Sequence, residues 1–357
     1  MMRLPAAGLT LLVAVLACSF PGPLPLEIEA PEISTPTANP ATHTTPNRPA
    51  LYTCYTCGGS ALWVLDEAGA TRRTLPISLG QFYGYAPSTD RILYARNFAG
   101  HGAGPGNVSV SDLAIYDLTS NTITVLFEDN VVEALWAPNG IDLAYILATP
   151  GSYELHWRGA DGTDRLLASD VSFTWSFSPL GDRIAFTRES GYHTGGEHGL
   201  FVVDIQTAPE IRISSVDKSG TGGIGDTPSW SADGQFVLLS HWGGPDEPQI
   251  ILARADGTGE TTLSLDPSLA ENWWYTPAIP HLLWFPDGQY LLGVPEAPRE
   301  SLGGPFGLVR FRLDVDEALL THGELVAEVG GLIGWDVPGI TVWVNSREGE
   351  PVRLELP

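Results

Sequence analysis

Four of the eight histidines in this chain stand in polar or glycine-rich stretches, at His101, His193, His198 and His241. Imidazole can bind a metal, transfer a proton near neutral pH or hydrogen-bond a ligand. His193 and His198 are five positions apart, a spacing that matches no strong metal motif. Three interpretations stay open: exposed polar residues, ligand contacts, or a metal or catalytic site, with His193, His198 and His241 as the metal candidates.

Aromatic residues accompany these histidines. Flat aromatic side chains bury much area at little entropic cost, so they suit a carbohydrate or peptide platform, but they also pack between sheets. Both interpretations stay open. The predicted ligand-binding set is His101, Tyr192, His193, His198, His241, Trp242, Trp274 and Tyr275.

Sequence motifs of common enzymes are missing. The chain contains no Gly-x-Ser-x-Gly, no His-Glu-x-x-His, no phosphate-binding loop and no dinucleotide-binding fingerprint. We therefore predict no cofactor and favour binding over catalysis.

A repeated sequence motif must position these residues. Trp230–Gly234 combines a closing aromatic, a turn ending in Gly and a following apolar run, which predicts strand, turn and strand. The same motif occurs at Trp136–Gly140, Phe177–Gly181 and Trp284–Gly288, and looser copies begin at Tyr85 and Trp335. Repeats of roughly 40–50 residues with four short strands each are typical of propeller blades.

The predicted fold is therefore all-β, a six-bladed propeller of four-stranded antiparallel blades. The N-terminal strands within Ala61–Ile77 would share a blade with the C-terminal strands and so leave no open sheet edge. Seven blades result if Leu51–Ile77 forms a reduced blade by itself.

The longer connections fall between the second and third strands of the predicted blades. Such connections share one face, and long loops on a rigid scaffold commonly carry binding residues. Arg96 and Arg188 end second strands near that face. The loops are Asn97–Ser111, Glu189–His198, His241–Glu247 and Pro295–Pro305.

The repeat resembles that of the TolB-type, WD40-like propeller family. Phe177-Ser178-Pro179, Trp230–Gly234 and Trp284–Gly288 carry the resemblance, and Ala160-Asp161-Gly162 and Ala255-Asp256-Gly257 stand where the repeat has its second turn. The resemblance covers nearly the whole chain after residue 60. It implies a fold more than a function, because the motif builds turns. Similar propellers, the oligogalacturonate lyases, hold a metal with histidines, which gives the alternative of a metal-dependent polysaccharide lyase or hydrolase.

Residues 1–18 resemble a bacterial lipoprotein signal. Arg3 precedes the apolar run Ala6–Ala17, and Val15–Cys18 resembles a lipobox whose Cys18 becomes lipidated. A plain secretory signal is the alternative. Residues 19–50 are rich in Pro and Thr and predict a disordered stalk, so the predicted propeller domain is 51–357.

Two further cysteines, Cys54 and Cys57, are expected to form a disulfide in an oxidising compartment. A redox-active pair is the alternative, and two cysteines alone are too few for a zinc site.

The net charge of −24 argues against a nucleic-acid partner, which needs a basic surface. The acidity favours solubility or a cation-binding surface. We expect a monomeric lipoprotein, at the cell surface or in the periplasm, held to the membrane by its lipid anchor only. Its expected ligand is an envelope or extracellular protein, a peptide or a glycan.

Overall fold

The computed structural model describes the chain in segments, all within one compact unit, Asn47–Pro357. Every regular element in these segments is a strand, and none contains a helix that could cross a membrane. The segments are 50–53, 62–65, 72–74, 82–86, 89–101, 109–188, 197–215, 227–242, 248–265, 282–293, 306–329, 331–337, 341–345 and 351–356.

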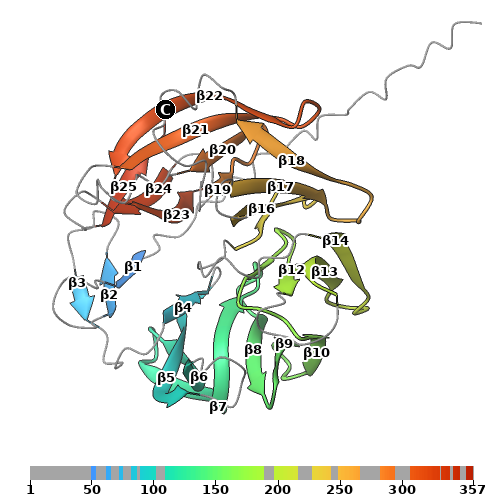
Figure 1. Cartoon of the computed structure of the whole chain (residues 1–357). Coiled ribbons are helices and arrows are strands. Elements are labelled where there is room, and N and C mark those ends of the chain that lie inside the picture. Colours follow the sequence, from blue (N-terminus) through green and yellow to red (C-terminus); the bar gives the residue numbers. More distant parts are fainter. Residues whose placement is uncertain are drawn as a thin grey trace, which may run out of the picture. The chain divides into compact units, whose positions relative to one another are not determined.

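Five four-stranded antiparallel meanders follow one another between β4 and β22 (Figure 1). Unit 1 contains β4 (Phe82–Tyr85), β5 (Arg91–His101), β6 (Ser109–Asp117) and the first part of β7 (Thr122–Trp136). Unit 2 contains the last part of β7 with β8 (Leu143–Thr149), β9 (Ser152–Arg158) and β10 (Asp164–Ser169). The 15-residue strand β7 thus joins two units without a turn.

The next three units repeat the same strand order. Unit 3 is β11 (Trp175–Phe177), β12 (Arg183–Arg188), β13 (Gly199–Asp204) and β14 (Glu210–Ser214). Unit 4 is β15 (Ser229–Trp230), β16 (Phe236–Trp242), β17 (Pro248–Arg254) and β18 (Glu260–Leu265). Unit 5 is β19 (Leu282–Trp284), β20 (Tyr290–Gly293), β21 (Phe306–Asp314) and β22 (Leu319–Val329).

The repeated motif forms the same turn in units 2 to 5. In each, the glycine N–H donates to the carbonyl three residues back, as Gly234 does to Ser231 at 2.9 Å. The glycine φ angles lie between +67° and +72°, a left-handed conformation that favours Gly. The prediction that this motif forms strand, turn and strand is confirmed.

The turns between third and fourth strands use aspartates. Asp117 and Asp204 accept backbone N–H donors two and three residues ahead, and Asp256 accepts from Thr258. The Ser120 N–H lowers the pKa of the Asp117 carboxyl, and the Thr207 N–H lowers that of Asp204. These acidic side chains therefore stabilise tight turns.

The core lies between successive units. One cluster joins Leu93 of unit 1 to Tyr145 of unit 2, and the next joins Ile146 of unit 2 to Phe186 of unit 3. Equivalent clusters join units 3 and 4, units 4 and 5, and unit 5 to Leu354 on the last strand. The units therefore pack face to face in chain order, which is the packing that builds propeller blades.

Burial within a unit follows from this packing. In β13, five consecutive residues are buried because both faces of the strand are covered, which is why middle strands are apolar without alternation. In the fourth strands β10 and β14, by contrast, several positions are exposed.

Indole N–H groups link the first strands of neighbouring units. Trp284 donates to the Ser229 carbonyl at 3.1 Å, and Trp230 donates to the Ser176 carbonyl at 3.3 Å. Both acceptors occupy the residue before the closing aromatic of the preceding unit. Arg183 adds a contact to unit 4, because it donates to the Gly234 carbonyl and lies over the Trp230 ring.

Unit 2 breaks this series. Its closing aromatic, Trp136, lies against Gly84 of unit 1, but its buried Nε1 has no hydrogen-bond partner. A register shift between Phe82 and Gly84 disrupts the β4–β5 ladder at this point. Unit 1 instead contacts unit 2 through the Tyr83 hydroxyl, which donates to the Val132 carbonyl at 2.9 Å.

The two ends of the folded unit differ from the predicted shared blade. β1 (Ala50–Thr53), β2 (Leu62–Leu65) and β3 (Arg72–Thr74) pair with one another. β23 (Gly331–Val337), β24 (Thr341–Asn345) and β25 (Pro351–Glu355) form a separate sheet. Ala50–Thr53, which overlaps the predicted stalk, supplies β2 with a local partner, so among the described strands the terminal sheets do not pair.

The indole series predicts unequal costs for one substitution. Trp230→Phe and Trp284→Phe each remove a hydrogen bond between units, whose net contribution is about 0.5–1.5 kcal/mol beyond the loss of ring volume. Trp136→Phe removes an unpaired N–H, so its cost should be smaller. Urea unfolding followed by far-ultraviolet circular dichroism measures all three, and equal costs would contradict the hydrogen-bond assignment.

Candidate functional site

A carboxyl group stands on the first strand of unit 2. Glu133 lies in the part of β7 that opens the unit, next to a register shift between Val131 and Glu133. Its Oε2 accepts the indole N–H of Trp175 on β11 at 3.1 Å. Burial raises the pKa of Glu133 to about 7, and the Trp175 hydrogen bond only partly offsets that increase.

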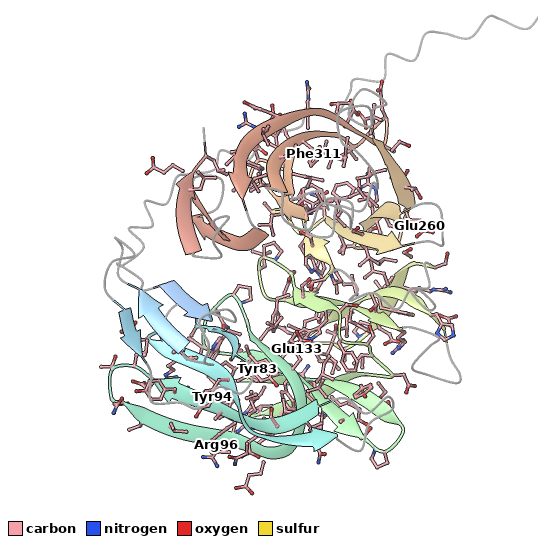
Figure 2. The ribbon with its side chains drawn as sticks, turned by 60° about the vertical axis from the view of Figure 1, so that its left-hand side comes forward. Tyr83, Tyr94, Arg96, Glu133, Glu260 and Phe311 are labelled. Atoms are coloured by element: carbon pink, nitrogen blue, oxygen red, sulfur yellow. The ribbon has the colours of Figure 1, made fainter. Side chains whose placement is uncertain are left out.

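Tyr83 on β4 completes this cluster from unit 1 (Figure 2). Its hydroxyl lies 3.4 Å from the Ser111 hydroxyl and donates to the Val132 carbonyl, next to Glu133. Burial raises the pKa of Tyr83 to about 12, and the charge of Glu133 contributes to the increase. Glu133, Tyr83 and Trp175 thus come from the opening strands of three consecutive units.

We call these three residues, Tyr83, Glu133 and Trp175, the inner-strand cluster. The chemistry available to it is proton exchange and hydrogen bonding. A carboxyl with a pKa near 7 can accept or release a proton near neutral pH. Tyr83 keeps its proton there and acts as a donor. Across the described segments, no three His, Cys, Asp or Glu side chains come together as a metal site.

Three of the predicted histidines can be placed by strand register. His101 ends β5, opposite Ser109, and His241 lies in β16, opposite Gln249. His198 directly precedes β13, whose first residue Gly199 pairs with Arg188. Each of the three therefore stands at the end of its unit where the second strand leads to the third.

The prediction that His101, His241 and Trp242 are loop residues is wrong for the backbone. β5 continues through His101, and β16 continues through Trp242, which pairs with Pro248. Pairing with Ser109 in unit 1 and with Pro248 and Gln249 in unit 4 extends the ladders beyond the expected strand ends. The second-to-third connections of units 1 and 4 are correspondingly shorter than expected.

His198 is the one predicted histidine whose side chain the structure describes. It is half-buried, and its Nδ1 is closed off from solvent without a hydrogen-bond partner. The remaining predicted residues lie outside the described residues, so their roles stay predictions: Cys18, Cys54, Cys57, Tyr192, His193, Trp274 and Tyr275.

The two arginines expected near the loop face are already paired. Arg188 forms a bidentate ion pair with Glu210 and donates to the Ser169 carbonyl, so it links the fourth strands of units 2 and 3. Arg96 lies within β5, with its Nε 3.4 Å from the buried Asp112 carboxylate. Both therefore stabilise the sheets.

A second polar network crosses unit 2. His156 on β9 lies 3.2 Å from both Glu154 and Asp164, and Tyr145 donates to Asp164 at 2.8 Å. Burial, followed by the hydrogen bond to Asp164, raises the pKa of Tyr145. Arg158 also approaches Asp164, so the network ties the second, third and fourth strands together.

None of the three residues of this cluster, Glu133, Tyr83 and Trp175, was predicted from the sequence. A signal existed for Glu133, because it is the one charged residue in the apolar run Val131–Trp136. An unpaired carboxylate is costly in a buried strand, so such an interruption indicates a specific role. Trp175 offered no comparable signal, since the repeat already accounts for many aromatics.

Comparison with known proteins gives similarities to solved structures only. No protein-family model matches the chain, and no curated protein sequence matches it. TolB from Acinetobacter baumannii is 14% identical, with a TM-score of 0.47 over 86% of this chain and 78% of that one.

Two other solved structures give comparable values. A putative 6-phosphogluconolactonase from Bacteroides fragilis is 14% identical, with a TM-score of 0.47 over 86% of this chain and 94% of that one. A putative TolB from Agrobacterium tumefaciens is 14% identical, with a TM-score of 0.45 over 83% of this chain and 98% of that one. All three TM-scores are below 0.5, so the fold description rests on strand pairing and packing within this chain.

The raised pKa of Glu133 predicts a pH-dependent effect of Glu133→Gln. The folded state holds the proton more tightly than the unfolded state, so the wild type loses stability as pH rises from about 4.5 to about 7. The glutamine variant has no such loss. Its free energy of unfolding, relative to wild type, should therefore increase by up to about 3 kcal/mol between pH 4 and pH 8.

Urea unfolding at both pH values measures this difference. Trp175→Phe is the matched variant. Loss of the indole donor should raise the pKa of Glu133, so the loss of stability should extend to higher pH than in the wild type. A difference between Glu133→Gln and wild type that does not change with pH would show that Glu133 does not titrate in this window.

Proposed function

We propose that the chain is an extracytoplasmic, TolB-like β-propeller that binds a protein, peptide or glycan ligand. Face-to-face packing of units 1 to 5, with a further cluster reaching Leu354, supports a propeller of at least these units. The separate pairing of β1–β3 favours seven blades over six, with the N-terminal sheet as a reduced blade.

The strand registers carry the binding proposal. They place His101, His198 and His241 at corresponding ends of units 1, 3 and 4. The opposite end of each unit consists of tight turns whose Asp and Asn side chains are engaged with their own backbone. Because the opposite end is used for turns, the end that carries the histidines is the surface that we propose for the ligand.

The proposed location follows from the N-terminal sequence. The lipobox-like segment ending at Cys18 would anchor the chain, and the Pro- and Thr-rich residues 19–50 would hold the propeller away from the membrane surface. Envelope proteins, extracellular peptides and glycans are then the partners within reach, and the acidic chain disfavours nucleic acid.

His198 motivates an alternative, a metal-dependent polysaccharide lyase or hydrolase. Its unpartnered Nδ1 could ligate a metal. The described side chains do not form a three-ligand set around it, so they do not by themselves fit a metal centre. Metal analysis of the full chain, purified without chelator, tests the alternative. A stoichiometric metal that is lost in His198→Ala would support the enzyme and contradict the binding proposal.

Site-specific photo-cross-linking tests the binding proposal. A benzoyl-phenylalanine at position 198 should capture a partner in cells, because it stands at the proposed binding end. The same residue at position 258, in a tight turn at the other end of unit 4, should not. Capture from position 258 alone, or equally from both, would contradict the proposed binding surface.

A further inference from the structure

Within the described part of the chain, only one oxygen of the Glu133 carboxylate has a hydrogen-bond partner. Oε2 accepts the Trp175 indole N–H, and no other described residue donates to Glu133. The Glu133 side chain is half-buried, and its Oε1 is not closed off from solvent. One oxygen is thus oriented by Trp175, while the other keeps access to solvent.

Among the described side chains, no cationic group pairs with this carboxylate. The arginines of neighbouring units pair with other acids, as Arg96 does with Asp112 and Arg188 with Glu210. The titratable group beside Glu133 is Tyr83, whose hydroxyl donates to the Val132 carbonyl. When Glu133 is ionised, its charge therefore has hydrogen-bonding neighbours and no counter-ion in the described part of the chain.

The carboxylate lies on an opening strand. In a propeller the first strands of the units lie nearest the central channel, so the position on β7 places Glu133 at the inner edge of its unit. The net charge of −24 raises the local concentration of cations near the protein and lowers that of anions. Position and charge both favour a cationic group at this point.

We propose that Oε1 of Glu133 binds the ammonium group of a ligand, with the Trp175 indole holding the carboxylate in place. The inference rests on the proposed propeller and names the chemistry of one ligand group. An ammonium supplies N–H donors and the missing counter-charge together. Because the ligand binds the ionised form, it competes with a proton, and affinity falls as pH drops below the pKa of the free carboxyl.

Butylammonium is the probe, and butan-1-ol and butyrate are the neutral and anionic controls. Each is titrated into the full chain at pH 8 and pH 5.5, with the Trp175 indole resonance and the melting temperature as readouts. At pH 8 butylammonium should shift the resonance and raise the melting temperature, and its affinity should be more than about tenfold weaker at pH 5.5. The two controls should do neither.

Two variants locate the effect. Glu133→Gln should abolish the response to butylammonium while it stays folded. Glu260→Gln changes an exposed carboxylate on β18 and should respond as wild type does (Figure 2). An acetylated Gly-Lys-Gly amide, titrated in parallel, separates the two sources of an ammonium: tighter binding of the peptide than of butylammonium assigns a lysine side chain, and weaker binding assigns a small amine.

Several results would overturn the inference. These are an undiminished response in Glu133→Gln, an equal response to butan-1-ol, or no response of the wild type at pH 8. The outcome is separable from that of cross-linking at position 198. Capture there without an amine response would refute only the Glu133 site, whereas an amine response without selective capture would refute only the proposed binding end.

Discussion

Face-to-face packing of successive sheets is the constraint on which this structure depends. Each middle strand must be apolar on both faces, because a neighbouring unit covers each side. The indole hydrogen bonds from Trp230 and Trp284 then set the alignment of one opening strand on the next. Apolar contact alone is non-directional, so these directional bonds fix how far each unit is displaced along its neighbour.

The junction between units 1 and 2 meets the same constraint by other means. The buried Trp136 indole reaches the expected position beside Gly84 without an acceptor, and the Tyr83 hydroxyl provides the hydrogen bond between the units. At the next junction the closing aromatic is Phe177, which has no N–H, and Trp175, two residues earlier, donates to the Glu133 carboxylate. Both departures from the repeat fall around unit 2, and they bring the titratable groups of the inner-strand cluster together.

Much of the fold could be predicted from the repeat. The turn at Trp230–Gly234 specifies strand, reversal and strand through local residue preferences, so its copies located the units correctly. Strand ends were less predictable, because His241 and Trp242 extend β16 through pairing with residues that follow the turn. Pairing of Ala50–Thr53 with β2 was missed for a similar reason, since a short segment beside a proline-rich stretch gives little local signal.

The candidate site was less accessible to sequence reasoning. Histidines and aromatics attract attention by residue type, whereas the importance of Glu133 depends on what surrounds it in three dimensions. Its raised pKa arises from burial between units that are far apart in sequence, and no local pattern encodes that burial. The lone acid within Val131–Trp136 was the available clue.

The most direct test of the inter-unit hydrogen bonds is the nuclear magnetic resonance spectrum of the ¹⁵N-labelled indole groups, assigned by single Trp→Phe substitutions. Hydrogen-bonded indole protons resonate downfield and change little with temperature. The structure predicts this behaviour for Trp230 and Trp284, and an upfield, temperature-sensitive proton for Trp136 despite its burial. If the Trp136 proton matched the other two, the break at the first junction, and with it the alignment proposed for the opening strands, would be contradicted.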